Sequence, residues 1–136
     1  MDLLKRRSLG RNYSAVFEDD GKVAYAYLLE DDKIVADVWL YNRIATPDQP
    51  EWRDRSKAPF ANPKGFASAE QFAAVCDENE VEFELSRASA GQIAVRVLIR
   101  GEYHAALVPG RKPGWCKLAL RDGPLASVLA PDAKLE

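Results

Sequence analysis

Three apolar runs separated by short acidic turns constrain the fold of this chain most strongly. Between Asn12 and Arg43 the sequence reads NYSAVFEDDGKVAYAYLLEDDKIVADVWLYNR, with breaks at Asp19-Asp20-Gly21 and at Asp31-Asp32. Runs rich in β-branched and aromatic residues are typical of strands, and Asp- and Gly-rich breaks are typical of hairpin turns. The pattern predicts an antiparallel meander, whose middle run from Val23 to Leu29 is apolar enough on both faces to be central.

A second meander is predicted in the other half of the chain. The segment VEFELSRASAGQIAVRVLIRGEYHAALVPGRKPGWCKLALRDG alternates apolar and polar residues with period two, and Ala90-Gly91 and Arg100-Gly101 supply turns. Two such meanders bury their apolar faces either as two packed sheets or as one strongly curved sheet. The fold class predicted is therefore α+β, mainly antiparallel β.

The middle of the chain carries a loop and the one predicted helix. Residues 44–66 contain four prolines and no steady periodicity, which indicates a long Pro-rich loop, and we expect Trp52, Phe60 and Phe66 to tuck under the sheet. Ser68 and Gln71 stand at capping-box spacing before an apolar stripe that includes Cys76. This spacing predicts a short helix near residues 68–78, with Cys76 as a small core residue.

Length and charge limit the domain organisation and the partners. With 136 residues the chain fits a single domain, 1–136, with a basic N-terminal arm at 1–11 and a flexible C-terminal tail at 131–136. The net charge of -2 disfavours nucleic acid as a partner, and neither a signal peptide nor a membrane-spanning run is recognised. We expect a cytoplasmic protein with reduced cysteines and no membrane association.

His104 and the two cysteines are the residues that first suggest chemistry. If residues 109–114 form a turn, simple pairing sets Leu107 opposite Cys116 and places His104 and Cys116 on opposite faces of the hairpin. A Cys/His nucleophilic pair needs hydrogen-bonding contact, so this register argues against one. One histidine and two distant cysteines show no metal-ligand spacing, and the usual nucleotide and serine hydrolase motifs are absent. No metal and no cofactor is predicted.

The chain also resembles a known family. The turn YSAVFEDDG, the run IAVRVLI, the pair His104-Ala105 and the ending Gly114-Trp115-Cys116 look like those of a group of small, uncharacterised bacterial cytosolic proteins described only as a domain of unknown function. The resemblance covers residues 12–43 and 80–121 and has no counterpart for the segment from Pro47 to Pro63. It implies a β-rich fold and adds no activity.

The function predicted first is that of a non-enzymatic binding or interaction protein, such as a small regulator, an adaptor or a toxin-neutralising partner. Its partner would be a protein or a small ligand, with the 44–66 loop as the contact surface, and a homodimer stays open. Tryptophan and arginine are enriched at interface hot spots. The candidate binding residues are Trp52, Arg53, Arg55, His104 and Trp115.

Two alternatives remain. A small enzyme would use His104 as a general base, oriented by Asp37 or by a glutamate of the Glu78–Glu84 run. Against this, Asp37 interrupts its strand in a way that also fits a side chain pointing to water or to a turn. In the second alternative, Lys5, Arg6, Arg7 and Arg11 form a basic arm for nucleic acid or anionic lipid.

Overall fold

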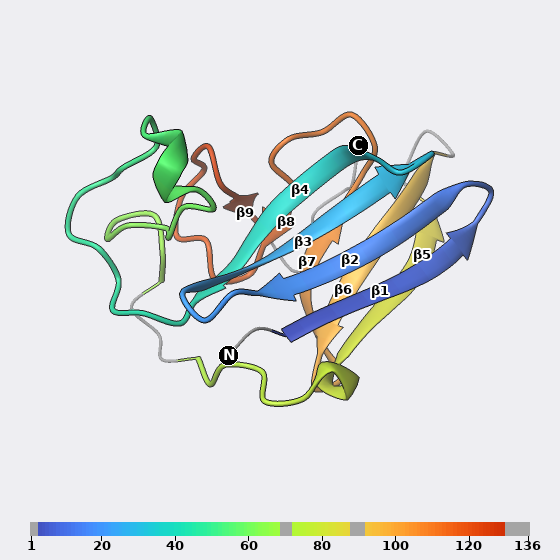
Figure 1. Cartoon of the computed structure of the whole chain (residues 1–136), viewed down its shortest axis with the longest axis horizontal. Helices are drawn as coiled ribbons and strands as arrows, with labels where there is room; N and C mark the ends of the chain where they lie inside the picture. Colours follow the sequence, from blue (N-terminus) through green and yellow to red (C-terminus); the bar gives the residue numbers. More distant parts are fainter. Residues whose placement is uncertain (1–2, 69–71, 88–91, 130–136) are drawn as a thin grey trace.

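Two β-sheets face each other and contain the nine strands of the described residues (Figure 1). The computed structural model describes residues 3–68, 72–87 and 92–129. The first sheet is an antiparallel meander in chain order, and its strands are β1 (Leu3–Gly10), β2 (Tyr13–Asp19), β3 (Val23–Glu30) and β4 (Lys33–Asn42). The meander predicted from Asn12 to Arg43 is confirmed, and β1 extends it by one strand.

The second sheet also follows chain order. Its strands are β5 (Val81–Arg87), β6 (Ile93–Ile99), β7 (Glu102–Leu107), β8 (Trp115–Cys116) and β9 (Ser127–Val128). Strands β5 to β8 pair antiparallel, whereas β8 and β9 pair parallel, so this sheet is mixed. The prediction of a mainly antiparallel β fold built from two meanders is confirmed, and of the two arrangements left open the structure has two sheets. The helical part of the predicted α+β class is not observed, because the helical elements of the described residues are short 3-10 turns.

Left-handed two-residue turns join three of the hairpins. Arg11-Asn12, Asp31-Asp32 and Arg100-Gly101 all have φ between +50° and +80°. Positive φ at both central residues gives a type I′ turn, whose twist matches that of the flanking strands. The turns predicted at Asp31-Asp32 and at Arg100-Gly101 are therefore confirmed, and the turn predicted at Ala90-Gly91 lies outside the described residues, as does the predicted tail at 131–136.

One hydrophobic cluster fills the space between the sheets. Alternate residues of each strand point into it, and its fully or nearly fully buried members include Phe17, Leu28 and Val38 from the first sheet and Val95, Val97 and Leu107 from the second. Each such side chain contributes about 1.5–3 kcal/mol on burial. Within the described ranges no helix is long and apolar enough to cross a membrane.

The predicted helix near residues 68–78 is wrong for the part of it that the structure describes. Residues 72–77 form no helix, and the only helical element there is a short 3-10 turn, η2 (Glu78–Glu80). A capping box is formed by Asp77 and Glu80, whereas Gln71, one half of the predicted box, lies outside the described residues. A helix of about ten residues is marginal by itself, and here the backbone of Val75 instead bonds to side chains of the first sheet.

The basic N-terminal segment is a strand rather than a free arm. Residues 3–10 form β1, and two of its side chains reach the edge strand of the other sheet: Lys5 Nζ donates to the carbonyl of Val81 (2.6 Å) and Arg7 donates to that of Phe83 (2.8 Å). Arg6 forms an ion pair with Asp32. These cations satisfy carbonyl groups on the open edge of β5, a known way of protecting an edge strand.

A buried carboxylate ties the segment before β5 to the first sheet. Asp19, with no exposed surface, accepts hydrogen bonds from the Tyr41 hydroxyl (2.6 Å), from Arg43 Nε (3.0 Å) and from the Gly21 N–H (2.9 Å). Arg43 also donates to the Val75 carbonyl, and the Val75 N–H donates to the Tyr41 hydroxyl. Burial alone would raise the pKa of Asp19, but the bonds from Arg43, Tyr41 and Gly21 outweigh it and hold the pKa below its ordinary value.

We expect Asp19→Asn to lower the free energy of unfolding by about 3 kcal/mol at neutral pH, the lower end of the cost of breaking a buried ion pair, because the Arg43 side chain keeps 35% of its surface exposed. Since the folded-state pKa is depressed, the stabilisation is present above the unfolded-state pKa of about 4 and is lost as the pH falls through the folded value. Urea unfolding at neutral and strongly acidic pH measures both. An equal difference between the two proteins at both pH values would contradict this role.

Candidate functional site

The only histidine of the chain lies at a β-bulge where the two sheets meet. The register of β6 with β7 skips His104, and the register of β3 with β4 skips Leu40. A skipped residue is the extra residue of a bulge, and it is left out of the regular ladder. These two bulges are bonded to each other, because His104 Nε2 lies 2.8 Å from the Leu40 carbonyl oxygen and Cys116 Sγ lies 3.4 Å from the same oxygen.

The prediction that His104 and Cys116 lie on opposite faces is wrong. Cys116 pairs with Ala105, two residues from the predicted Leu107, and a shift of two does not change which face a side chain occupies. The bulge does change it, because it adds one residue at His104 and brings the imidazole to the side of the thiol. Both side chains share one acceptor, the Leu40 carbonyl.

Burial holds both groups in their neutral forms. His104 and Cys116 have no exposed surface. Burial lowers the pKa of His104 to about 4 and raises the pKa of Cys116 to about 12. A carbonyl only accepts, so Nε2 carries the imidazole proton, while Nδ1 is buried without a hydrogen-bond partner among the described residues. The centroids of the His104 and Phe72 rings lie 4.8 Å apart. A protonated thiol is not a nucleophile, and neither ring nitrogen contacts a carboxylate in the described ranges.

We expect the His104 ring to stay neutral from about pH 8 down to about pH 5, so its Hε1 proton should show no NMR titration in that range. Because the pKa of His104 in the folded protein lies below the ordinary value of 6.5, the contribution of the neutral ring to the free energy of unfolding is fully present above about pH 6.5. This contribution decreases as the pH falls toward 4. His104→Leu leaves the Leu40 carbonyl short of a donor and should cost about 1–3 kcal/mol. Urea unfolding should also show that the free energy of unfolding of this variant lacks the His104-dependent decrease between about pH 6.5 and 4. A titration midpoint of His104 near 6.5 in the folded protein would contradict the burial of its ring.

The two thiols should differ sharply in reactivity. Cys76 is exposed, which corrects its predicted place in the core, whereas Cys116 is fully enclosed. Ellman's reagent should therefore label one thiol in the native protein and the second only after unfolding. Cys76→Ser should abolish native labelling, and rapid labelling of that variant would show that Cys116 is accessible.

The other predicted binding residues lie apart from His104 in their contacts. Trp52 packs against the main hydrophobic cluster and meets Phe66 edge to face at 5.0 Å, as expected for a tucked loop, while Arg53 and Arg55 are exposed. Trp115 is 7% exposed, belongs to a second hydrophobic cluster and is covered by the Arg111 guanidinium at 4.3 Å. The structure thus gathers neither the tryptophans nor the arginines around the histidine.

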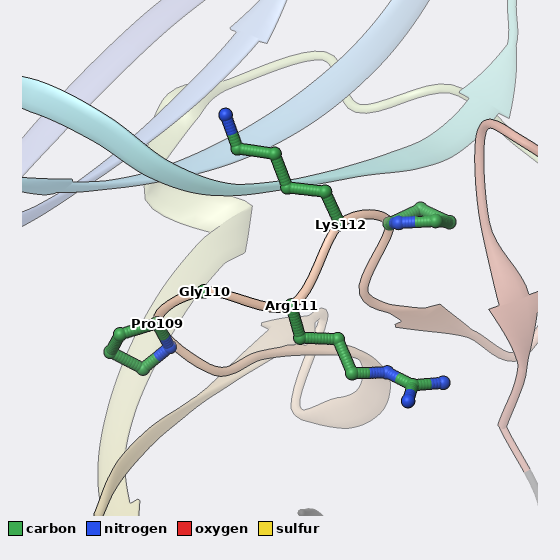
Figure 2. Close-up of a pocket in the computed structure, with 5 residues that line it drawn as sticks. Pro109, Gly110, Arg111 and Lys112 are labelled. Atoms are coloured by element: carbon green, nitrogen blue, oxygen red, sulfur yellow. The ribbon is translucent and has the colours of Figure 1, made fainter.

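A hollow of about 510 Å³ lies at the loop between β7 and β8. Pro109, Gly110, Arg111 and Lys112 line it, and Figure 2 shows the Lys112 and Arg111 side chains extending in opposite directions from the loop. All of its lining residues belong to this one loop, 109–113. Binding sites bring together polar groups from several elements, so this hollow is the open surface of a turn.

A groove of about 410 Å³ has a different construction, because two strands and two loop segments line it. Its floor is formed by Tyr25 and Tyr27 of β3 and by Asp37 of β4, which is the cross-strand neighbour of Tyr27. Ala26 and Leu28 alternate with the tyrosines and point into the core, so the groove lies on the face of the first sheet that is turned away from the second.

Two loop segments form the walls of this groove and are bonded to its floor. One wall is Ala58, Pro59 and Phe60 of the predicted 44–66 loop, which is confirmed as a segment without strands that holds only a short 3-10 turn, η1 (Arg55–Lys57). The Tyr25 hydroxyl donates to the Phe60 carbonyl (2.7 Å). The other wall is Pro124 and Leu125, and the Trp39 N–H donates to the Leu125 carbonyl (3.0 Å).

The polar groups of the groove come from its floor. The Asp37 carboxylate has no hydrogen bond or ion pair to any described residue; burial raises its pKa, and the charge of Lys112 opposes this rise. Burial also raises the pKa of Tyr25 and, to about 12, that of Tyr27. The two rings stack with centroids 6.0 Å apart and planes 12° apart. The groove therefore presents a carboxylate beside two protonated phenols and apolar walls.

Comparison with known proteins does not place this chain in a family. No family model, no curated protein and no solved structure matches it. The resemblance to the group of uncharacterised bacterial proteins therefore stays a prediction. In the described parts of the chain, no three His, Cys, Asp or Glu side chains are grouped so that they could hold a metal ion.

The groove was only partly visible in the sequence. Tyr25 and Tyr27 fall on one face of a strand that is otherwise rich in alanine, and Asp37 interrupts an apolar run, so both signals were present. Nothing in the spacing linked them to Pro59, Phe60 or Pro124, which lie 22 or more positions from Asp37. Such contacts depend on how the loops cross the sheet.

Proposed function

We propose that this protein is a non-enzymatic binding protein and that the groove formed by Tyr25, Tyr27, Asp37, Ala58–Phe60 and Pro124–Leu125 holds its ligand. The observation that supports this most is the half-buried Asp37 carboxylate, which no described residue pairs, at the floor of an otherwise aromatic and apolar groove. Ligand sites are typically concave, mostly apolar and supplied with a few polar groups, in volumes of about 300–1,000 Å³.

The chemistry of the lining favours binding over catalysis. The ionisable side chains of the groove are Asp37 and the two tyrosines, and the raised pKa of each phenol keeps it protonated at neutral pH. A nucleophile paired with a base, which nucleophilic catalysis needs, is not among these lining residues. His104 is enclosed between the sheets and does not line the groove.

The contacts of the two walls indicate that the binding site is preformed. Hydrogen bonds from Tyr25 to Phe60 and from Trp39 to Leu125 hold both loop segments against the sheet. Proline rings and stacked aromatic rings lose little conformational freedom on binding, so little free energy is spent on ordering the site. The predicted contact surface, the 44–66 loop, enters this proposal through residues 58–60 and not through Arg53 and Arg55.

A fragment screen by two-dimensional ¹H–¹⁵N NMR tests this function. The library should contain cationic, neutral and anionic fragments in equal shares, so that no ligand charge is assumed. We expect shift changes to gather at the amides of Tyr25, Tyr27, Asp37, Phe60 and Leu125. Tyr25→Ala, which removes a ring of the floor, should weaken these hits, while Glu84→Gln on the second sheet should not. Hits that gather elsewhere, or none at all, would overturn the proposal.

A further inference from the structure

We infer that the occupant of this groove is an arginine side chain presented by a partner protein. This inference rests on the proposed function and adds the chemical class of the ligand. It draws on three observations: the charge around the floor, the flat aromatic and proline surfaces, and the shape of the groove; the position of Lys112 then supplies a test.

The groove is acidic, and no cation of the described residues forms an ion pair with its carboxylate. Asp37 is the only charged residue in the lining, and its carboxylate makes no ion pair within the described chain. Glu18 and Asp20 also lie close enough to the tyrosines to raise the pKa of Tyr27 together with Asp37. A half-buried carboxylate lacks part of its hydration, so a cation that reaches it gains more than it would in open solvent.

The surfaces beside Asp37 suit a guanidinium better than an ammonium. The nearly parallel rings of Tyr25 and Tyr27 and the ring of Pro59 offer flat, weakly polar contact. A guanidinium is planar, is less strongly hydrated than an ammonium, stacks on aromatic faces and can donate two parallel hydrogen bonds to one carboxylate. The Tyr27 hydroxyl, which has no hydrogen bond to a described residue, is a further acceptor in the groove, and Tyr27 is the cross-strand neighbour of Asp37.

The shape of the groove favours an arginine that belongs to a protein. Its volume of about 410 Å³ is at the small end of ligand pockets, enough for one long side chain and its neighbouring backbone. Its rim includes the exposed Pro124 and Ala58, apolar groups that the residues flanking the arginine would cover. An arginine anchored in a pocket and surrounded by apolar contacts is a common arrangement at interface hot spots.

Lys112 is an internal competitor for this site. Its charge lowers the pKa of Asp37 but does not reach ion-pairing distance. The loop that carries it is held to β4 by hydrogen bonds from Gly110 N to the Val35 carbonyl (2.8 Å) and from Gly114 N to the Asp37 carbonyl (2.7 Å). The positive charge therefore stays near the carboxylate and repels an incoming guanidinium, so removing it should strengthen binding.

Peptide titration tests the inference. The probes are a short peptide with one central arginine, the same peptide with citrulline, which has the same shape without the charge, the same peptide with lysine, and N-acetylarginine amide. We expect the arginine peptide to shift the amides of Tyr27, Asp37 and Phe60, and to bind at least about tenfold more tightly than the citrulline peptide. Lysine should bind more weakly than arginine, and N-acetylarginine amide more weakly than the peptide.

Charge variants give effects of opposite sign, which a loss of folding does not. Asp37→Asn should weaken the arginine peptide about tenfold or more, whereas Lys112→Gln should strengthen it about twofold to threefold. Glu84→Gln is the matched control, and thermal unfolding checks that each variant is folded. Tyr27→Phe should weaken binding modestly and keep the preference for arginine.

The outcomes separate this inference from the proposed function. If neutral fragments or the citrulline peptide occupy the groove as tightly as the arginine peptide, the groove binds ligands but the assignment of arginine is wrong. If N-acetylarginine amide binds as tightly as the peptide, the ligand is a small cation and the assignment to a partner protein is wrong. If no probe and no fragment reaches the groove, both proposals fail.

Discussion

The carbonyl group of Leu40 is the point on which the arrangement of the two sheets depends. A bulge frees it from the ladder of the first sheet, and a second bulge brings His104 to it together with Cys116. A buried carbonyl without a donor costs free energy, so these bonds fix the position of β7 and β8 relative to β4. Other backbone groups on the open edge of β4 are also paired, because they form hydrogen bonds with the backbone of Gly110, Gly114 and Leu125. Strand β4 thus forms part of the first sheet and also bonds to the second sheet. Because His104 makes one of these bonds, the only histidine of the chain is enclosed between the sheets.

The groove is a consequence of that junction. Gly114 approaches Asp37 closely enough to donate to its carbonyl, and a side chain at this position would collide with the Ala106 carbonyl, so only glycine fits. The Leu125 carbonyl accepts a hydrogen bond from the backbone N–H of Trp39, two residues after Asp37 in β4, and this bond places Pro124 at the rim of the groove. The bonds that close the open edge of β4 therefore also build one wall of the groove. The floor on the first sheet and the core beneath it are held by the same strands, so a ligand would meet a surface with little freedom to move.

Much of the fold could be predicted because period-two alternation and turn residues report local backbone geometry directly. Both meanders, the turns at Asp31-Asp32 and Arg100-Gly101, and the irregular 44–66 segment follow from it. The helix near 68–78 failed because Arg43 and Tyr41, more than 30 positions away, bind the backbone of Val75. The prediction for the face of His104 was wrong because one inserted residue moves the side chains that follow it to the opposite face of the strand. Period-two alternation in the sequence does not reveal such a bulge. Predicting the groove would have required the paths of the two loops that form its walls, which residue spacing alone does not give.

The bonding of Lys5 and Arg7 to β5 has a consequence for how copies of this molecule meet. Cationic side chains occupy the β5 edge of the second sheet, and loops occupy the β4 edge of the first sheet. At the other edges of the two sheets, β1 and the two-residue strand β9 each keep a side that no other described strand pairs, and Lys5, Arg6 and Arg7 follow one another along β1. In the antiparallel register that pairs Arg6 with Arg6 of another copy, these three positive charges would face the same three, and like charges placed opposite each other destabilise a strand pair. The basic residues that join β1 to β5 therefore also disfavour edge-to-edge pairing of β1 with β1 of another copy.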